Sequence, residues 1–192
     1  MKKMKHTILL TFGLLLVAPM LYANDLEVAL SSETAQFTLR SDSSIIGWGG
    51  ADVGLGLFYN DVGDFLIQGS IMQLRNTDNA SPLKLGVGVK AYAGTLDDIT
   101  QDVFAFSLGG ELRYTFPGAH PMSIYLQGYH APKITSFADT ESLTDINFGF
   151  QIEALPQTTA FIGVRRIRID TDEVDNVRVD DKKVHFGVRL QF

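Results

Sequence analysis

The chain has 192 residues, a formal net charge of −6 and no cysteine, and 45% of its residues are hydrophobic. Without cysteine it can form no disulfide and carry no lipoprotein-type anchor. Its acidic charge excludes the basic surface that nucleic-acid binding requires.

The N-terminus has the pattern of a secretory signal peptide. Three lysines within residues 1–5 precede an apolar run, Thr7–Ala18, which is too short for a membrane helix of ~20 residues. Pro19 ends this run, and Leu21-Tyr22-Ala23 ends in a small residue. We therefore predict a signal peptide over residues 1–23, cleaved near Ala23. Its removal changes the net charge to −9 and leaves residues 24–192 as one domain.

No later segment has the length of a membrane helix. If the mature protein enters a membrane, it must do so as strands closed into a barrel, because every backbone polar group needs a partner in lipid. Residues 25–40 change their hydrophobic phase midway, which a hairpin turning at Ser32-Glu33 explains. Such a hairpin places three pairs opposite each other on one face: Leu30 with Ala35, Val28 with Phe37, and Leu26 with Leu39.

Eight further segments alternate between apolar and polar residues, as strands with one apolar face do. They are residues 47–59, 64–75, 83–94, 104–116, 122–129, 145–153, 160–165 and 184–192. With the hairpin they predict an all-β fold, an antiparallel up-and-down transmembrane β-barrel of ten strands. The alternative is an eight-stranded barrel with residues 24–44 as a separate hairpin or plug, because the hairpin arms are shorter than the ~9–11 residues of a membrane strand.

The connections between these segments alternate in length, as they do in membrane barrels. Short joints at 76–82, 117–121 and 155–158 are expected on the periplasmic side. Longer acidic loops at 95–102, 131–142 and 170–181 are expected outside, where 60–64 is a short exception. The last segment ends in Phe192 and resembles the terminal strand of bacterial outer-membrane barrels. We expect the barrel assembly machinery to bind this strand.

Alternation also fits a soluble, lipocalin-like barrel with its apolar face inward. Glycines and charges of both signs on the polar face favour lipid outside, because they suit a crowded lumen. Aromatic residues near the strand ends favour it too, since they suit two interfacial girdles. The periplasmic girdle would contain Trp48, Tyr114, Phe116 and Phe192, and the outer girdle Tyr59, Phe65, Tyr92 and Phe104.

Several short stretches, taken in order, resemble the YfaZ family of outer-membrane proteins. They are Gly88-Val89-Lys90-Ala91-Tyr92, Leu108-Gly109-Gly110-Glu111-Leu112-Arg113-Tyr114, Tyr129-His130-Ala131-Pro132-Lys133, Gly163-Val164-Arg165-Arg166-Ile167 and Gly187-Val188-Arg189-Leu190-Gln191-Phe192. The resemblance covers about Asn24 to the end. It implies an outer-membrane barrel and carries over no catalytic residues.

The main candidate site is a set of charged residues predicted to face the lumen. It contains Lys90, Glu111, Arg113, Glu153, Arg165 and Arg189. One interpretation is a salt-bridged plug, because eight strands leave a lumen just filled by side chains and ten leave little more. The other interpretation is the selectivity lining of a small pore.

Arg166 and Arg168 are predicted to face outward, where they could contact lipopolysaccharide phosphates or lie on a solvated rim. A hydrolase triad at the outer rim is a further hypothesis and would consist of His130, Ser136 and Asp139. The alternative is that these residues form a solvated loop edge. The acidic segment 170–175 lacks the oxygen ligand and glycine of an EF-hand at positions 174 and 175, which leaves a looser cation site or a solvated loop.

These patterns predict a monomeric outer-membrane protein that is not an enzyme and carries no metal or cofactor. Its expected partners are outer-membrane lipid and lipopolysaccharide. A structural or binding role in the bacterial envelope is the main hypothesis. A small porin-like channel is the second and an outer-membrane hydrolase the third.

Overall fold

A computed structural model describes residues 24–42, 50–78, 81–97, 101–118, 121–172, 174 and 177–192. The predicted signal peptide and Trp48 lie outside the described residues. No helix in these ranges is both long and apolar enough to cross a membrane.

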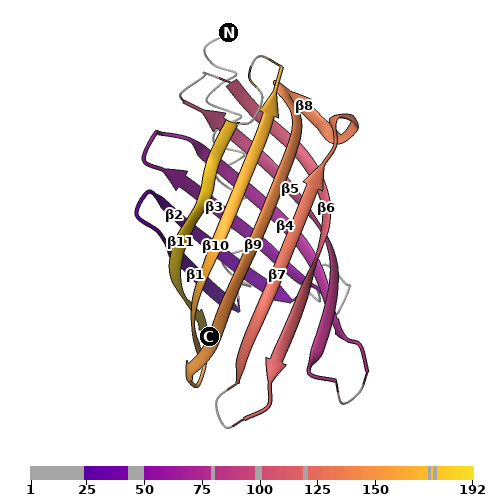
Figure 1. The fold of residues 1–192 in the computed structure, drawn as a ribbon, viewed down its shortest axis with the longest axis vertical. Coiled ribbons are helices and arrows are strands. Elements are labelled where there is room, and N and C mark those ends of the chain that lie inside the picture. The colour runs from indigo at the N-terminus through magenta and orange to yellow at the C-terminus, as the bar shows by residue number, and fades with distance from the viewer. Residues whose placement is uncertain are drawn as a thin grey trace.

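Antiparallel strands form a closed barrel with ten strands in its wall (Figure 1). The wall strands are β1 (Asp25–Leu30), β2 (Thr34–Asp42), β3 (Asp52–Asn60), β4 (Phe65–Asn76), β5 (Leu83–Leu96), β6 (Gln101–Phe116), β7 (Met122–Ala131), β9 (Thr140–Leu155), β10 (Thr158–Thr171) and β11 (Val177–Gln191). Pairing of β1 with β11 and of β5 with β6 completes the ring. A short helix η3 (Lys133–Thr135) and strand β8 (Ser136–Ala138) follow β7.

The first two strands confirm the predicted hairpin and its register. Leu30 pairs with Ala35, Val28 with Phe37, and Leu26 with Leu39. All six residues of β1 also pair with β11, from Asp25 opposite Gln191 to Leu30 opposite Phe186. The hairpin is therefore part of the wall, and the alternative of an eight-stranded barrel with a plug is wrong.

The barrel has two ends, which we name by what lies there. At the terminal end, the Phe192 N–H donates to the Asn24 carbonyl at 2.8 Å. The short connections after β4, β6 and β9 lie at the same end, which is the lower one in Figure 1. The opposite end carries the connections after β1, β3, β5, β7 and β10, and we call it the loop end.

Strands reach further toward the loop end than the sequence pattern predicts. β5 continues to Leu96, β9 begins at Thr140, β10 continues to Thr171 and β11 begins at Val177. The predicted loops over 95–102, 131–142 and 170–181 are therefore shorter than expected, because strands occupy both ends of each range. In β10, Ile167 and Ile169 are buried inside while Arg166 and Arg168 face outward.

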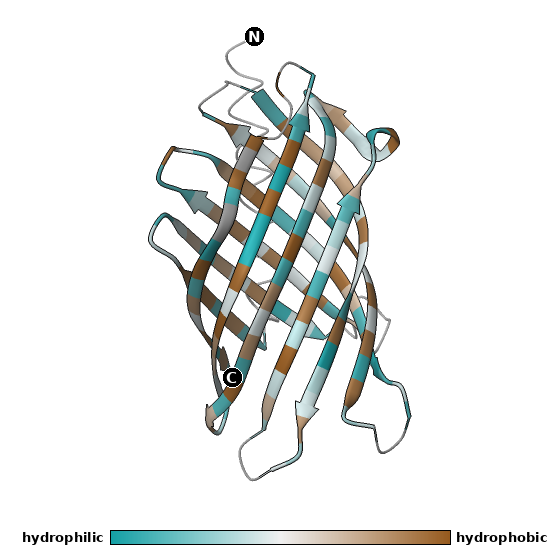
Figure 2. Cartoon of the chain, in the orientation of Figure 1, coloured by the Kyte–Doolittle hydropathy of each residue, from teal (hydrophilic) through white to brown (hydrophobic). Residues whose placement is uncertain are grey.

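The outer face is apolar over most of its height. Figure 2 shows hydrophobic and hydrophilic residues alternating along the strands, and the outward members are exposed leucine, isoleucine, valine and phenylalanine side chains. Most of the predicted girdle residues that the structure describes are exposed, namely Tyr59, Phe65, Phe104, Tyr114, Phe116 and Phe192. Tyr92 is the exception. It is fully buried in the lumen, so its assignment to the outer girdle is wrong.

The lumen near the loop end is filled by a hydrophobic cluster, which we call the apolar layer. Its side chains come from β3 to β7 and from β9 to β11, and each is at most 3% exposed. They are Phe58, Leu66, Tyr92, Leu96, Val103, Ala105, Ala131, Leu143, Ile167, Ile169 and Val179. These side chains are therefore removed from water and form a hydrophobic core inside the barrel.

Candidate functional site

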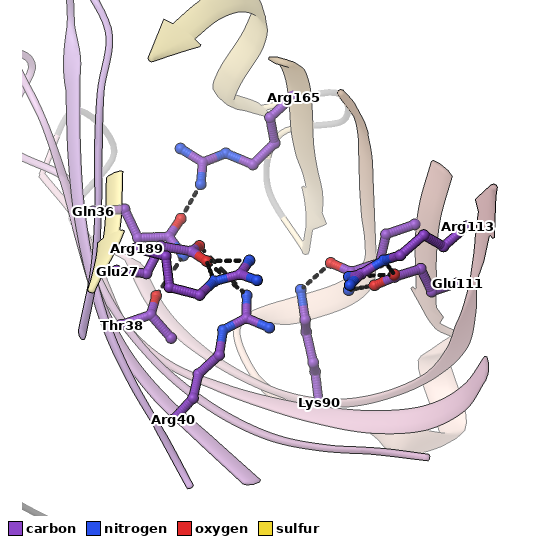
Figure 3. Close-up of polar contacts among 10 residues, drawn as sticks. Glu27, Gln36, Thr38, Arg40, Lys90, Glu111, Arg113, Arg165 and Arg189 are labelled. Carbon is purple, nitrogen blue, oxygen red and sulfur yellow. Dashed lines mark hydrogen bonds and ion pairs between the residues drawn. The ribbon is translucent and has the colours of Figure 1, made fainter. Parts of the chain in front are cut away.

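Between the apolar layer and the terminal end, the lumen is lined by charged and polar side chains, which we call the charged layer (Figure 3). Its charged members are Glu27, Arg40, Lys90, Glu111, Arg113, Asp145, Arg165, Asp180 and Arg189. Each reaches the lumen because the alternation of its strand turns it to the inner face. An ion in such a confined space needs a partner, because burial removes its hydration.

Glu27 joins the first strand of the barrel to the last. It lies opposite Arg189 in the β1–β11 pair, and its Oε2 is 2.6 Å from Arg189 Nη2. Arg40 on β2 approaches the same oxygen at 3.1 Å, so one carboxylate holds two guanidinium groups. Figure 3 shows the three side chains converging. The ring is thus closed by this charge cluster as well as by backbone hydrogen bonds.

A second group lies across the lumen on β5, β6 and β7. Glu111 Oε1 is 2.6 Å from Arg113 Nη2, and its other oxygen accepts from Gln127 Nε2 at 3.2 Å. Gln127 Oε1 in turn accepts from Lys90 Nζ at 3.3 Å. This chain of contacts fixes four side chains from three neighbouring strands.

Asp145 links the charged layer to the apolar layer. Its Oδ2 accepts from Lys90 Nζ at 3.0 Å and from the Tyr92 hydroxyl at 2.7 Å. The Tyr92 ring belongs to the apolar layer. On the other side of Asp145, the Lys90 Nζ lies 4.4 Å from the centroid of the Tyr129 ring. The tyrosine therefore buries its ring among apolar side chains and satisfies its hydroxyl in the charged layer.

Arg165 forms the other link. Its Nε donates to Asp180 Oδ2 at 2.7 Å, its Nη1 donates to Gln36, and its guanidinium lies 4.9 Å from the Phe58 ring centroid. Arg165 and Asp180 are 5% and 4% exposed, so this pair is almost completely removed from water. A buried pair with several partners holds its strands in one geometry, although its net contribution to stability is small.

The structure brings together five of the six residues predicted for this site. Lys90, Glu111, Arg113, Arg165 and Arg189 all contact partners inside the lumen. Glu153 does not join them, because it is exposed near the terminal end of β9, where its N–H donates to the Pro121 carbonyl.

Sequence reasoning missed four residues of the charged layer. Glu27 and Arg40 alternate with the apolar residues of the first hairpin, and that phase could have identified them. Asp145 begins the predicted segment 145–153, and its alternation with Ile146 and Phe148 could have placed it in the lumen. Asp180 was assigned to a loop, so no signal in the alternation pointed to it.

The space left inside the charged layer is small. Among the described residues, two cavities lie here, of about 70 Å³ and about 30 Å³. Both cavities are large enough to hold water. Gln68 Nε2, the Tyr129 hydroxyl and Asp145 Oδ1 face the larger cavity without a protein partner, and water could satisfy them.

Glycines let aromatic side chains fill the lumen. A Cβ at Gly187 would lie 2.0 Å from the Phe161 ring, and one at Gly109 would lie 2.5 Å from the Tyr129 ring. These rings occupy the space that a side chain would need. The glycines on the inner face therefore make room for packing rather than for a passage.

The outward residues singled out from the sequence have local partners. Arg168 Nε lies 3.4 Å from Asp170 Oδ1, and Asp170 Oδ2 accepts from the Ser142 hydroxyl at 2.7 Å. Arg166 lies half-buried on the same outer face of β10. The two arginines therefore lie on one face, as predicted, with Arg168 already next to a carboxylate.

The structure does not bring His130, Ser136 and Asp139 together as a triad. His130 Nδ1 bonds the Thr144 hydroxyl at 3.0 Å, and the Ser136 hydroxyl donates to the Pro132 carbonyl at 3.0 Å. Asp139 accepts from the backbone N–H of Asp102 at 2.9 Å.

The acidic segment 170–175 is only partly described, because Glu173 and Asp175 lie outside the described residues. Across the part of the chain that the structure describes, no three His, Cys, Asp or Glu side chains are grouped closely enough to hold a metal ion.

A family model described as "YfaZ precursor" matches residues 1–192. A search of curated proteins and a search of solved structures found no match.

Proposed function

The chain belongs to the YfaZ precursor family, and we propose from this premise that it is an exported outer-membrane β-barrel with a structural or binding role in the bacterial envelope. The closed barrel and the word "precursor" in the family description support export to the outer membrane. A signal peptide over residues 1–23 is part of this proposal.

The distribution of apolar residues supports lipid around the wall. Large apolar side chains are exposed on the outer face, including Val87 and Leu108 at 72% and 73%. Exposed apolar patches of more than a few hundred Å² are rare on soluble monomers. A soluble barrel would instead direct these side chains inward and the charged layer outward.

The filled lumen carries the proposal of a structural or binding role. A channel for small solutes needs a continuous passage, whereas the two cavities described in the charged layer measure about 70 and 30 Å³ and an apolar layer lies toward the loop end. Charged side chains in the rest of the lumen are held by ion pairs. We therefore place the barrel among closed membrane proteins and rank the porin-like channel below it.

The proposed partners follow from the same geometry. Arg166 and Arg168 on the outer face could contact lipopolysaccharide phosphates, because guanidinium groups bind phosphate well. β11 ends at the terminal end with Phe192 70% exposed, which suits recognition by the barrel assembly machinery. Because the described wall strands close into a ring, they leave no open edge that needs to pair with a strand of a second copy. We therefore propose a monomer.

The separate partners of His130, Ser136 and Asp139 support a role without catalysis.

Cell fractionation tests the proposed location most simply. The protein should be found in the outer-membrane fraction and migrate differently on a denaturing gel before and after heating. Recovery from the soluble periplasmic fraction, with no change on heating, would contradict the proposal.

A further inference from the structure

Between β7 and β8 the chain leaves the wall and returns to it. β7 pairs with β6 as far as His130 opposite Leu108, and β8 resumes at Ser136 opposite Ala105. Residues 132–135, which include helix η3, project from the wall between these two points, as the loop beside β8 in Figure 1 shows. We call residues 132–135 the hook.

The position of the hook can be read from the strand beside it. β6 carries outward apolar residues up to Phe104, and the next outward residue toward the loop end is the exposed Asp102. The hook leaves and rejoins the wall between the levels of Leu108 and Ala105, below the end of this apolar stretch. It therefore projects from the part of the wall that we propose to be covered by lipid.

The hook and the strand after it present apolar side chains outward. Ile134 in η3 is 86% exposed, more than any other large hydrophobic residue described. Phe137 in β8 is 49% exposed, and its ring centroid lies 5.8 Å from that of Phe104 and 6.3 Å from that of Phe106. Ile134 is thus a further exposed apolar side chain, three residues before a phenylalanine that packs on the wall.

Two carbonyls of the hook accept hydrogen bonds locally, which lowers the cost of placing them in lipid. The Pro132 carbonyl accepts from the Thr135 N–H at 2.9 Å, the Thr135 hydroxyl at 3.2 Å and the Ser136 hydroxyl at 3.0 Å. The Lys133 carbonyl accepts from the Ser136 N–H. Lys133 itself pairs with Glu141 at the start of β9, and its long apolar stem lets the ammonium reach toward the polar interface.

Hydrogen bonds from the next residues hold the hook in place. Asp139 Oδ2 accepts from the Asp102 N–H at 2.9 Å, and the Asp139 carbonyl accepts from the Asp172 N–H at 3.0 Å. The chain turns there with Ala138 at a φ of 56°. The exposed Ile134 is therefore presented by a fixed structure and not by a free loop.

We infer that the hook is a membrane anchor, in which Ile134 lies in the acyl chains just below the headgroups while Lys133 reaches the headgroup region. Its occupant is lipid, because the hook continues the apolar outer face, and its Pro132 and Lys133 carbonyls accept local hydrogen bonds. The inference rests on the proposed outer-membrane location. An anchor of this kind would fix how deeply this side of the barrel is immersed.

Cysteine labelling tests this inference, because the natural chain has no cysteine. Ile134→Cys, Leu108→Cys and Val174→Cys variants would be folded into phospholipid vesicles and treated with a membrane-impermeant maleimide. Ile134 is 86% exposed on the protein, so only lipid can protect it. We expect Ile134→Cys and Leu108→Cys to resist labelling, and Val174→Cys, at the loop end, to react.

The controls separate failure of the anchor from failure of the proposed function. Labelling of Ile134→Cys beside a protected Leu108→Cys would overturn the anchor and leave the membrane barrel in place. Labelling of both would overturn both proposals. Protection of Ile134→Cys in whole cells but not in vesicles would identify a protein partner and would also overturn the lipid anchor.

The depth of the hook can be measured independently by tryptophan quenching. In a Trp48→Phe background, which removes the only natural tryptophan, Ile134→Trp and Leu108→Trp would be quenched by phospholipids brominated at different positions along the acyl chain. We expect Ile134→Trp to be quenched most by bromines near the headgroup and Leu108→Trp by bromines further down the chain. No quenching of Ile134→Trp by any of these lipids, with quenching of Leu108→Trp retained, would refute the anchor.

Discussion

The two layers of the lumen fill similar spaces by opposite chemistry. The apolar layer packs hydrocarbon side chains that are at most 3% exposed, and the charged layer packs ion pairs around two small cavities. The charged layer alone could be interpreted as a wet selectivity lining. The apolar layer above it favours a plug over a lining, because moving an ion through a segment lined by buried apolar side chains is costly.

The two layers also differ in what they do for the wall. In the charged layer, Glu27 joins β1 to β11 and β2, where the hydrogen-bonded ladder is only six residue pairs long. In the apolar layer, side chains from eight strands meet in one cluster. We therefore expect the charged layer to fix closure of the ring and the apolar layer to seal it.

The largest effect is expected from removing the carboxylate that closes the ring. Glu27→Ala leaves the guanidinium groups of Arg40 and Arg189 without their shared partner. Breaking a buried pair in this way costs about 3–5 kcal/mol. Urea unfolding in detergent micelles measures the loss.

The matched control is Glu153→Ala, which removes an exposed carboxylate and should change the free energy of unfolding by no more than about 0.5 kcal/mol. Equal effects of the two variants would contradict this role of Glu27.

A somewhat smaller loss is expected from a cavity in the apolar layer. Leu66 on β4 is fully buried, so Leu66→Ala should lower the free energy of unfolding by about 2–5 kcal/mol. Its neighbour Ile67 faces outward, where detergent can fill the space left by Ile67→Ala. Chemical unfolding in micelles compares the two variants. A greater loss from Ile67→Ala would show that the layer is less well packed than described.

Overpacking of the charged layer should cost less again. A methyl group at position 187 would overlap the Phe161 ring, so we expect Gly187→Ala to lower the free energy of unfolding by about 1–3 kcal/mol. The control is Gly69→Ala, since nothing lies within 4 Å of a Cβ at position 69. Thermal unfolding followed by gel migration distinguishes them. If both variants unfold like the natural protein, Phe161 does not occupy this space in solution.

The smallest effect is expected outside both layers, at the exposed pair of Lys133 and Glu141. The hydrogen bond from Lys133 to Glu141 and the charge of that carboxylate raise the pKa of Lys133. The pair is therefore intact at neutral pH, and its contribution is lost only as the pH rises through that raised pKa. Because both groups remain in contact with solvent, Glu141→Gln should leave the unfolding midpoint unchanged at neutral pH. A clear shift would place this pair among the buried ones.

Much of the fold could be predicted because alternation directly reports which face of a strand is apolar. The register of the first hairpin followed from Leu30 and Ala35, and the inward direction of Lys90 and Arg165 from their phase. The strand segments near the loop end were missed because their alternation has the opposite sense, with Ile167 inside and Arg168 outside. Polar residues outside and apolar residues inside suit a part of the wall that extends beyond the lipid. A search for strands with an apolar outer face mistakes such a segment for a polar loop.

Pairing across the lumen could not be read from the sequence. Lys90 and Asp145 lie 55 residues apart and meet only because the ring closes at a particular diameter. Asp180 lies in a segment that was predicted to be a loop. It reaches Arg165 because the β10–β11 register shifts between Arg165 and Arg166 and again between Ile167 and Arg168. Phase predicts the face on which a residue lies, whereas partners depend on strand count, stagger and the volume of every other inward side chain.

Planar-bilayer recording of the purified protein tests the central claim most directly, because current requires a continuous wet passage through both layers. The filled lumen predicts no steady conductance even at high protein load, in preparations where heat-modifiable migration shows that the barrel is folded. Reproducible single-channel steps from such preparations would contradict the account and restore the porin-like channel as the better proposal.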